Sequence, residues 1–168
     1  CRLDTVGIAA TRLNATILQQ SLIEVGCKVC ERIPETTQDA AELLRSHIIV
    51  VMGGTTPGHT TDAVAVALAR DCSAAHCVIA TNVSHVHDSD PRVNPEAKAI
   101  EEMTLAELSE ITGTEPLAPG ESAAVDPIAV KWAIDAAIKL AVLDGRDLSR
   151  LEDALEGREF IGTLVRVE

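Results

Sequence analysis

The sequence predicts an α/β domain, specifically a three-layer α/β/α sandwich with a mainly parallel sheet. Helical and strand patterns alternate along the 168 residues, and this alternation is typical of a parallel sheet. The segments 47–52 and 76–80 are mostly apolar, as expected for strands covered on both faces. With one Phe, one Trp and no Tyr, the core must consist of Ala, Val, Ile and Leu. We therefore expect a single layered domain over residues 1–168.

The N-terminal elements follow from hydrophobic periodicity and from capping residues. Residues 5–24 predict a helix with a buried face, and Gly26 fits its C-terminal stop. The apolar residues at near-helical spacing are Ile8, Leu13, Ile17, Leu18 and Leu22. Residues 27–33 alternate in polarity and predict a strand, and 37–45 predict a helix with a Thr cap. The apolar run 47–52 then predicts the second strand.

The C-terminal elements continue the alternation. A helix at 62–71 leads to the strand 76–80, and the Asp-Pro and Asn-Pro breakers make 81–96 a loop. The remaining elements are helices at 104–111, 123–137 and 147–156, strands at 139–143 and 161–166, and a Gly/Pro-rich loop over 112–122. Parallel sheets bind ligands at the carboxyl ends of their strands, so we expect a site in the loops after 47–52 and 76–80.

Composition excludes several classes of function. The formal net charge of −12 would repel nucleic acid and anionic membranes, and a chain with almost no aromatic residues has little to stack on single-stranded bases. No apolar run is long enough to span a membrane, and the start has no basic-then-apolar signal pattern. The five cysteines are an odd number, which favours reduced thiols and a cytoplasmic protein.

The segment 53–62 (GGTTPGHTTD) is the strongest local signal. Its three glycines allow a sharp turn and the close approach of a ligand, and its threonines supply hydroxyl donors. The helix that follows adds free backbone N–H groups and a positive dipole end, so a phosphate or carboxylate site is predicted. No Gly-Lys-Ser/Thr triplet ends the segment, so it is not a P-loop. Asp62 at the rim suits the orientation of a Lys or a metal ion, while a helix N-cap with a tight turn would use the same residue types.

A second polar loop follows the strand 76–80. Thr81, Asn82 and Asp90 could hold a ribose, a base edge or hydrated Mg²⁺ at the same edge of the sheet. A surface loop that ends in the Asp90-Pro91 turn is the alternative interpretation. His59, inside the first loop, could donate to a phosphate.

Metal sites are weaker alternatives. Cys27 and Cys30 could bind zinc with Cys72, His76 and Cys77, but there is no second Cys-x-x-Cys pair and buried thiols explain the pattern better. His85 and His87 are two residues apart and could bind a metal ion, although a solvated loop explains them better. Trp132 is expected in the core.

The motifs together resemble a known family. VMGGTTPGHTTDAVAVALA (51–69), followed by ATNV (80–83) and DSDPRVNPEAK (88–98), is similar to the archaeal-type UMP kinases of the amino-acid-kinase superfamily. The segments 3–18, 121–134 and 142–165 resemble that family in the same order, so the resemblance covers nearly the whole chain. It implies transfer of a phosphoryl group from ATP with Mg²⁺ to UMP, giving UDP for pyrimidine nucleotide biosynthesis, in a homo-oligomer such as a hexamer.

The resemblance also implies a role for each matching residue. The UMP phosphate and uracil would be held by the loop residues Thr55, Thr56, Pro57, Gly58, His59, Thr60 and Thr61, and the UMP ribose by Asp4. Thr81, Asn82, His87 and Asp90 match positions around the ATP nucleoside, and Asp62 matches an Asp that positions the catalytic lysine. The UMP-binding part would then cover about 1–75 and the ATP-binding part about 76–168.

The chain departs from the family pattern in two regions. The strand and Gly-Gly-Ser loop that open the family's fold, together with a nearby Lys, are absent from the sequence, so an N-terminally truncated domain is expected. Ser84-His85 replaces an Asp-Gly pair, and His87 replaces a Tyr near adenine, which affects nucleotide preference. A nucleotide-binding module without catalysis, and a related kinase for another phosphate or carboxylate, are the alternative hypotheses.

Overall fold

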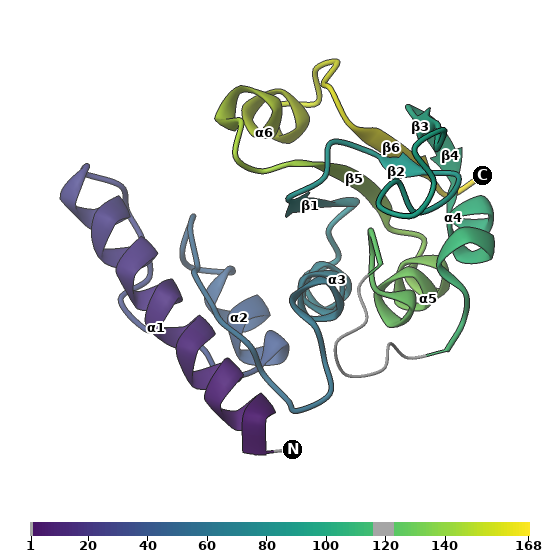
Figure 1. The fold of residues 1–168 in the computed structure, drawn as a ribbon. Helices are drawn as coiled ribbons and strands as arrows, with labels where there is room; N and C mark the ends of the chain where they lie inside the picture. The colour runs from purple at the N-terminus through teal and green to yellow at the C-terminus, as the bar shows by residue number, and fades with distance from the viewer. Residues whose placement is uncertain (1, 116–122) are drawn as a thin grey trace. The chain divides into compact units, whose positions relative to one another are not determined.

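The computed structural model describes residues 2–115 and 123–168, so most of the predicted loop 112–122 lies outside the described residues. The chain forms two compact units, Cys1–Ser73 and Ala74–Glu168, and each is described by itself. Figure 1 shows their elements in chain order.

The first unit is built from helices. These are α1 (Arg2–Glu24), α2 (Thr37–Leu43) and α3 (Thr61–Asp71). Thr36 caps α2 by accepting the Asp39 N–H at 3.1 Å, and the Thr37 hydroxyl donates to Asp71 at 2.6 Å, which ties α2 to the end of α3. The three helices confirm the three helical predictions for this half of the chain to within a few residues.

Two expectations for the first unit were wrong. The predicted strands 27–33 and 47–52 form a single parallel bridge, Val29 to Ile49, in place of a ladder. The hydrogen bonds of Cys30 show where the pairing ends: its N–H donates to Ile49 O at 2.9 Å, whereas its carbonyl accepts the buried Gln19 side chain at 2.7 Å.

The packing face of α1 also differs from the prediction. Ala15 and Gln19 are buried, whereas Leu13 and Ile17 are 62% and 57% exposed. The structure therefore turns the small and polar residues of α1 inward and leaves a row of large apolar side chains outside.

The second unit holds a four-stranded sheet in the order β1-β5-β6-β4. β1 (His76–Thr81) is parallel to β5 (Lys139–Asp144), β6 (Thr163–Arg166) is antiparallel to β5, and β4 (Glu102–Thr104) is parallel to β6. A small hairpin pairs β2 (Val86–His87) with β3 (Ala99–Ile100). Two of the three pairs in the main sheet are parallel, which confirms the mainly parallel sheet.

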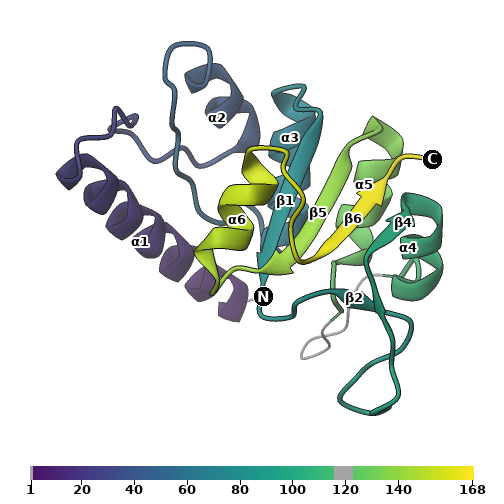
Figure 2. The same cartoon turned by 90° about the horizontal axis from the view of Figure 1, so that it is seen from above.

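Helices cover both faces of this sheet. α6 (Leu148–Leu155) lies on one face, and α4 (Leu105–Thr112) and α5 (Pro127–Ala136) lie on the other (Figures 1 and 2). Thr104 and Glu107 form a capping box on α4, and Asp126 caps α5 before Pro127. The second unit therefore has the three layers that the sequence predicts.

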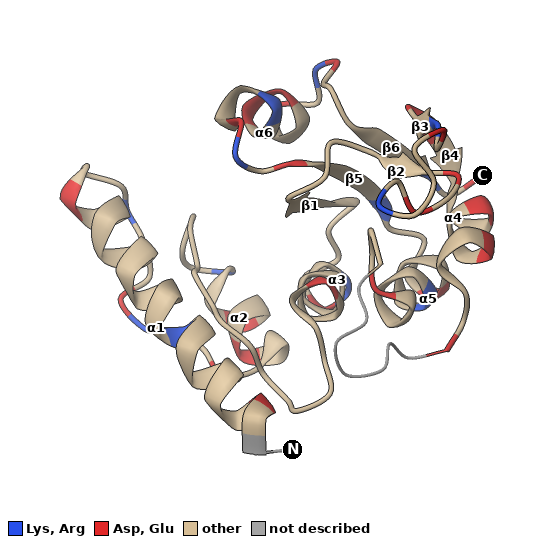
Figure 3. Cartoon of the chain, viewed as in Figure 1, with Lys and Arg blue, Asp and Glu red and all other residues tan. Residues whose placement is uncertain are grey.

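The core of the second unit is aliphatic, as expected from the composition. Its largest fully buried side chains are Val86, Leu105, Leu108, Val125, Val130, Ile138, Leu140, Val142, Leu143 and Val165. Trp132 is only half-buried, so the prediction that it belongs to the core was wrong. Acidic side chains lie on α2, α4 and α6, where water screens their charge (Figure 3).

Candidate functional site

The Gly/Thr-rich loop forms the approach to α3. The Thr60 side chain caps this helix by accepting the Ala63 N–H at 3.2 Å, which confirms the capping interpretation for that residue. Gly58 has φ +87°, a conformation that favours glycine, and the His59 N–H donates to Thr56 O at 3.2 Å. Residues 56–59 therefore form a tight turn directly before the N-terminus of α3, where backbone N–H groups attract anions.

Glycines bring this loop against α1. A Cβ on Gly53 would lie 2.7 Å from the backbone nitrogen of Arg12, so only glycine permits this approach. The Gly54 N–H donates to the Thr11 hydroxyl at 2.8 Å, and the Gly54 carbonyl accepts from Arg12 Nε at 3.1 Å. The start of the loop is thus fixed to the middle of the helix.

The residues predicted to bind UMP all lie in this first unit. Asp4, in the first turn of α1, is half-buried and lies seven residues before Thr11, which places both on the same face of the helix. Thr55 and Thr60 are half-buried, whereas the exposed loop residues are Thr56, Pro57, Gly58, His59 and Thr61. Asp62 lies half-buried in the first turn of α3, where the helix dipole favours a carboxylate.

The second unit contains a cavity of about 780 Å³ at the carboxyl end of β1. All four residues predicted to surround the ATP nucleoside line it: Thr81, Asn82, His87 and Asp90. Ile111 and Thr112 at the end of α4 also line the cavity. Sequence patterns did not predict these two residues, because the residue types at the end of a helix do not indicate which loop packs beside it.

Hydrogen bonds set the charge inside this cavity. Arg92 donates to both carboxylate oxygens of Asp90, and the pKa of Asp90 is lowered mainly by this side chain. Burial lowers the pKa of His85, and the neighbouring His87 adds to the effect, which favours the neutral imidazole. Asp88 also lines the cavity and accepts hydrogen bonds from the Ser89 hydroxyl and the Lys98 N–H, so the lining carries one carboxylate beyond the Asp90–Arg92 pair.

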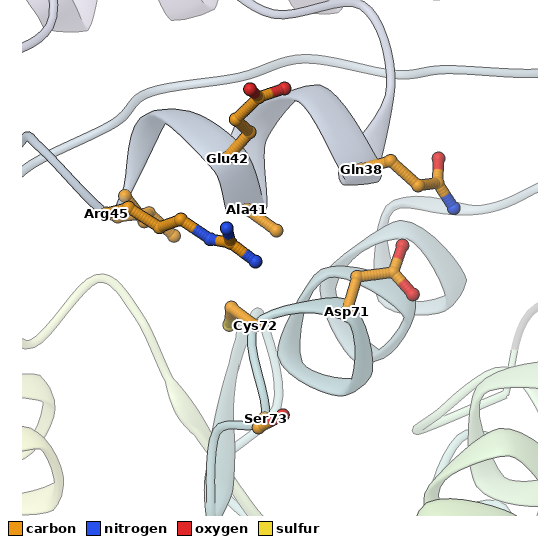
Figure 4. Close-up of a pocket in the computed structure, with 8 residues that line it drawn as sticks. Gln38, Ala41, Glu42, Arg45, Asp71, Cys72 and Ser73 are labelled. Atoms are coloured by element: carbon orange, nitrogen blue, oxygen red, sulfur yellow. The ribbon is translucent and has the colours of Figure 1, made fainter.

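A different cavity of about 660 Å³ lies at the ends of α2 and α3 (Figure 4). Arg45, Glu42 and Asp71 line it with charges of both signs, and Asp71 already accepts hydrogen bonds from Thr37 and Arg70. Cys72 also lines it. None of the predicted site residues lies here, and the mixed charges, two carboxylates and one arginine, give no basis for assigning a ligand.

Residues 2–115 and 123–168, which the structure describes, contain neither a metal cluster nor a membrane-spanning helix. Within these ranges, no three His, Cys, Asp or Glu side chains are grouped so that they could hold a metal ion. The pairs Cys27 and Cys30, and His85 and His87, are therefore not supplemented by a third ligand from the described part of the chain. In the same ranges, no helix combines the length and apolarity needed to cross a membrane.

Comparison with known proteins gives consistent matches. Residues 2–144 match the amino acid kinase family. The uridylate kinase of Methanococcus aeolicus is 44% identical over 142 residues, which are 84% of this chain and 62% of the relative. That of Methanococcus vannielii is 41% identical over 162 residues, 96% of this chain and 70% of the relative.

A solved structure matches as well. The crystal structure of uridylate kinase from Archaeoglobus fulgidus has a TM-score of 0.82 at 34% identity, and the match covers 96% of this chain and 71% of that one. This likeness confirms the α/β fold class. The chain thus spans 62–71% of the length of these three relatives.

Proposed function

Because the chain belongs to the amino acid kinase family, we propose that it binds UMP and ATP for transfer of the γ-phosphoryl group of ATP to UMP. One observation carries the proposal: the four residues expected around ATP, which are spread over positions 81 to 90, line a single cavity at the carboxyl end of a sheet strand. Nucleotides bind at this edge in α/β folds. The relatives at 41–44% identity are uridylate kinases, which supports UMP as the acceptor.

The reaction depends on positioning and on charge neutralisation more than on covalent chemistry. An oxygen of the UMP phosphate forms a bond to the γ-phosphorus, the bond from that phosphorus to the bridging oxygen breaks, and ADP leaves with UDP as the product. Threonine hydroxyls and backbone N–H groups of the loop 55–61 would hold the acceptor phosphate. Asp62, beside this loop, would orient a catalytic lysine.

We propose Mg²⁺ as the cofactor, carried by the ATP phosphates. This fits the donor set, because the residues that the structure describes offer no group of three metal ligands and Mg²⁺ is commonly held by substrate phosphates with one or two carboxylates. Asp90 and Asp88 are the carboxylates that line the ATP cavity. When bound, the ion offsets the charge on the transferring group.

The exposed face of α1 supports a homo-oligomer. Leu3, Val6, Leu13 and Ile17 are 78%, 67%, 62% and 57% exposed and recur at spacings of three, seven and four residues. An exposed apolar row at this spacing is typical of a helix that packs on another helix. We propose that a second copy covers it in a cytoplasmic assembly, for which a hexamer is the hypothesis from the family resemblance.

A second candidate is a nucleotide-binding module without transferase activity. The single Gly-Gly pair of the sequence, at 53–54, is used in the loop before α3, so these 168 residues contain no second pair for a triphosphate loop. Such a module would bind UMP and ATP and release them unchanged.

The test combines catalysis with binding. UDP formation from ATP and UMP is measured with the 168 residues and with the longest product of the gene, and calorimetry compares UMP with AMP, CMP and aspartate. UDP formation that is lost in Asp62→Asn supports the kinase. UMP and ATP binding without UDP in any form supports the module. Preference for aspartate or another monophosphate would overturn UMP as the acceptor.

A further inference from the structure

We propose that Arg12 and Arg146 are positioning residues, each of which holds the backbone of one nucleotide-binding loop in place. The inference rests on the proposed function, because it assigns these loops to UMP and to ATP. Each arginine joins a carboxylate to the carbonyl of a loop residue far away in the sequence, and we call this arrangement an arginine brace.

The brace in the second unit begins at the end of β5. Arg146 donates from Nε to Asp144 at 2.8 Å and from Nη2 to both Asp144 and the Asn82 carbonyl, the latter at 3.1 Å. The Nε and Nη2 contacts fix the guanidinium at two points, and Asp144 also accepts the Arg146 backbone N–H at 3.0 Å. Asn82 lies 64 residues away and lines the ATP cavity.

The ends of β1 and β5 lie close together beside this brace. Thr81 is the register partner of Asp144, and the Gly145 N–H donates to Thr81 O at 2.9 Å. A Cβ on Gly145 would lie 2.9 Å from the Ala80 Cβ, so only glycine allows the two strand ends to come this close. The carbonyls of Thr81 and Asn82 are therefore both held from the β5 side.

The first unit contains the same arrangement. Arg12 donates from Nε to Gly54 O at 3.1 Å, and its Nη1 lies 3.1 Å from Glu35. Gly54 lies 42 residues from Arg12 and directly precedes the loop 55–61. Two units of different architecture thus use an arginine, a carboxylate and a loop carbonyl at the start of each predicted nucleotide loop.

Stability alone does not explain these contacts. Each pair has one exposed member, Arg146 at 73% and Glu35 at 74%, beside a more covered partner, Asp144 at 17% and Arg12 at 29%. Ion pairs with one side open to water contribute modestly to the free energy of unfolding. Several other arginines, such as Arg158 with Asp153, pair only with residues close by in the sequence. Arg12 and Arg146 differ because a guanidinium offers several donors in a fixed plane and can bind a carboxylate and a carbonyl together.

The test compares one variant of each arginine with the wild type in the 168-residue chain. Hydrogen exchange followed by mass spectrometry measures the loops, and calorimetry measures UMP and Mg²⁺-ATP binding. Arg12→Ala should speed exchange in 54–61 and weaken UMP binding by roughly three- to tenfold, the loss of about one hydrogen bond, without a change for ATP. Arg146→Ala should do the same for 82–92 and ATP, without a change for UMP.

Three further variants and the wild type decide the interpretation. Arg12→Lys and Arg146→Lys should recover part of the effect, since lysine keeps the charge but not the planar donors. Arg158→Ala should change neither loop. Unchanged exchange in Arg12→Ala and Arg146→Ala, or equal loosening of both loops by either one, would overturn the brace. If the wild type binds neither nucleotide, the proposed function fails, while the exchange data still decide whether the arginines fix the loops.

Discussion

The Thr163 hydroxyl accepts the Val86 N–H at 2.8 Å, although the two residues are 77 positions apart in the sequence. The same hydroxyl donates to Ile100 O at 2.6 Å. Thr163 begins β6, whereas Val86 and Ile100 are register partners in the small hairpin. One buried side chain therefore joins the hairpin that carries His87 to the main sheet.

Thr163→Val should destabilise the second unit by about 2 kcal/mol or more, because a buried N–H and a carbonyl both lose their partner. Thr163→Ser keeps the hydroxyl and loses only a methyl group, so it should cost about 1 kcal/mol. Urea unfolding of the wild type and both variants measures the difference. A larger loss in the Ser variant than in the Val variant would show that packing of the methyl group matters more than the hydrogen bonds.

Two glycine-to-alanine changes should have opposite effects on the free energy of unfolding. In Gly53→Ala the new Cβ would lie 2.7 Å from the Arg12 nitrogen and 2.8 Å from the Thr11 carbonyl carbon, so the backbone must shift at a cost of about 1–3 kcal/mol. Gly7 lies within α1, and a Cβ at this position would have no atom within 4 Å. Because alanine loses less conformational entropy than glycine in a helix, Gly7→Ala should stabilise the unit by about 0.5–1 kcal/mol. Thermal unfolding compares the two, and a Gly53→Ala chain as stable as the wild type would contradict the close approach.

The sequence patterns predicted those helices and strands that depend on residues close by in the chain. Short apolar runs predicted β1 and β5, and the loop predicted after 76–80 follows β1 and lines a cavity at its carboxyl end. The segment 47–52 is not a strand of this sheet, so a common edge for the two loops stays a prediction. The caps Thr36, Thr60 and Thr104 mark helix starts through contacts within three residues. These contacts can be recognised from residue type and spacing alone.

Contacts between distant residues could not be predicted in this way. The segment 27–33 has the alternation of a strand, but the Cys30 carbonyl accepts the side chain of Gln19, which is eleven residues away, and the pairing with 47–52 is limited to one bridge. The strands β2 and β3 have two residues each, which is too short for any periodicity to show. Arg12 and Arg146 look like ordinary surface residues until the fold brings Gly54 and Asn82 beside them.

The apolar row on α1 should control assembly. Leu13→Glu places a charge in the middle of the row and should convert an oligomer into a 17.8 kDa monomer in light scattering, because the seam can no longer be buried without leaving a carboxylate unpaired. Thr16→Glu is the matched control, since Thr16 is also exposed but lies about a quarter turn from the row. A wild-type chain that is already monomeric, or equal loss in both variants, would contradict the interface.

The Asp144 carboxyl should report on the second brace through its titration. The Arg146 side chain, followed by the Arg146 N–H, lowers the pKa of Asp144 from 3.8 to about 2. Because the pKa in the folded chain is below its unfolded value, the interaction stabilises the fold above pH 3.8 and this contribution disappears as the pH falls toward about 2. Arg146→Gln removes the charge and should raise the pKa of Asp144 toward 3.8, as measured from carboxyl carbon shifts by NMR. The pKa of Asp90, which Arg92 lowers, should not move in this variant, and an Asp144 pKa still near 2 would show that Arg146 is not its partner in solution.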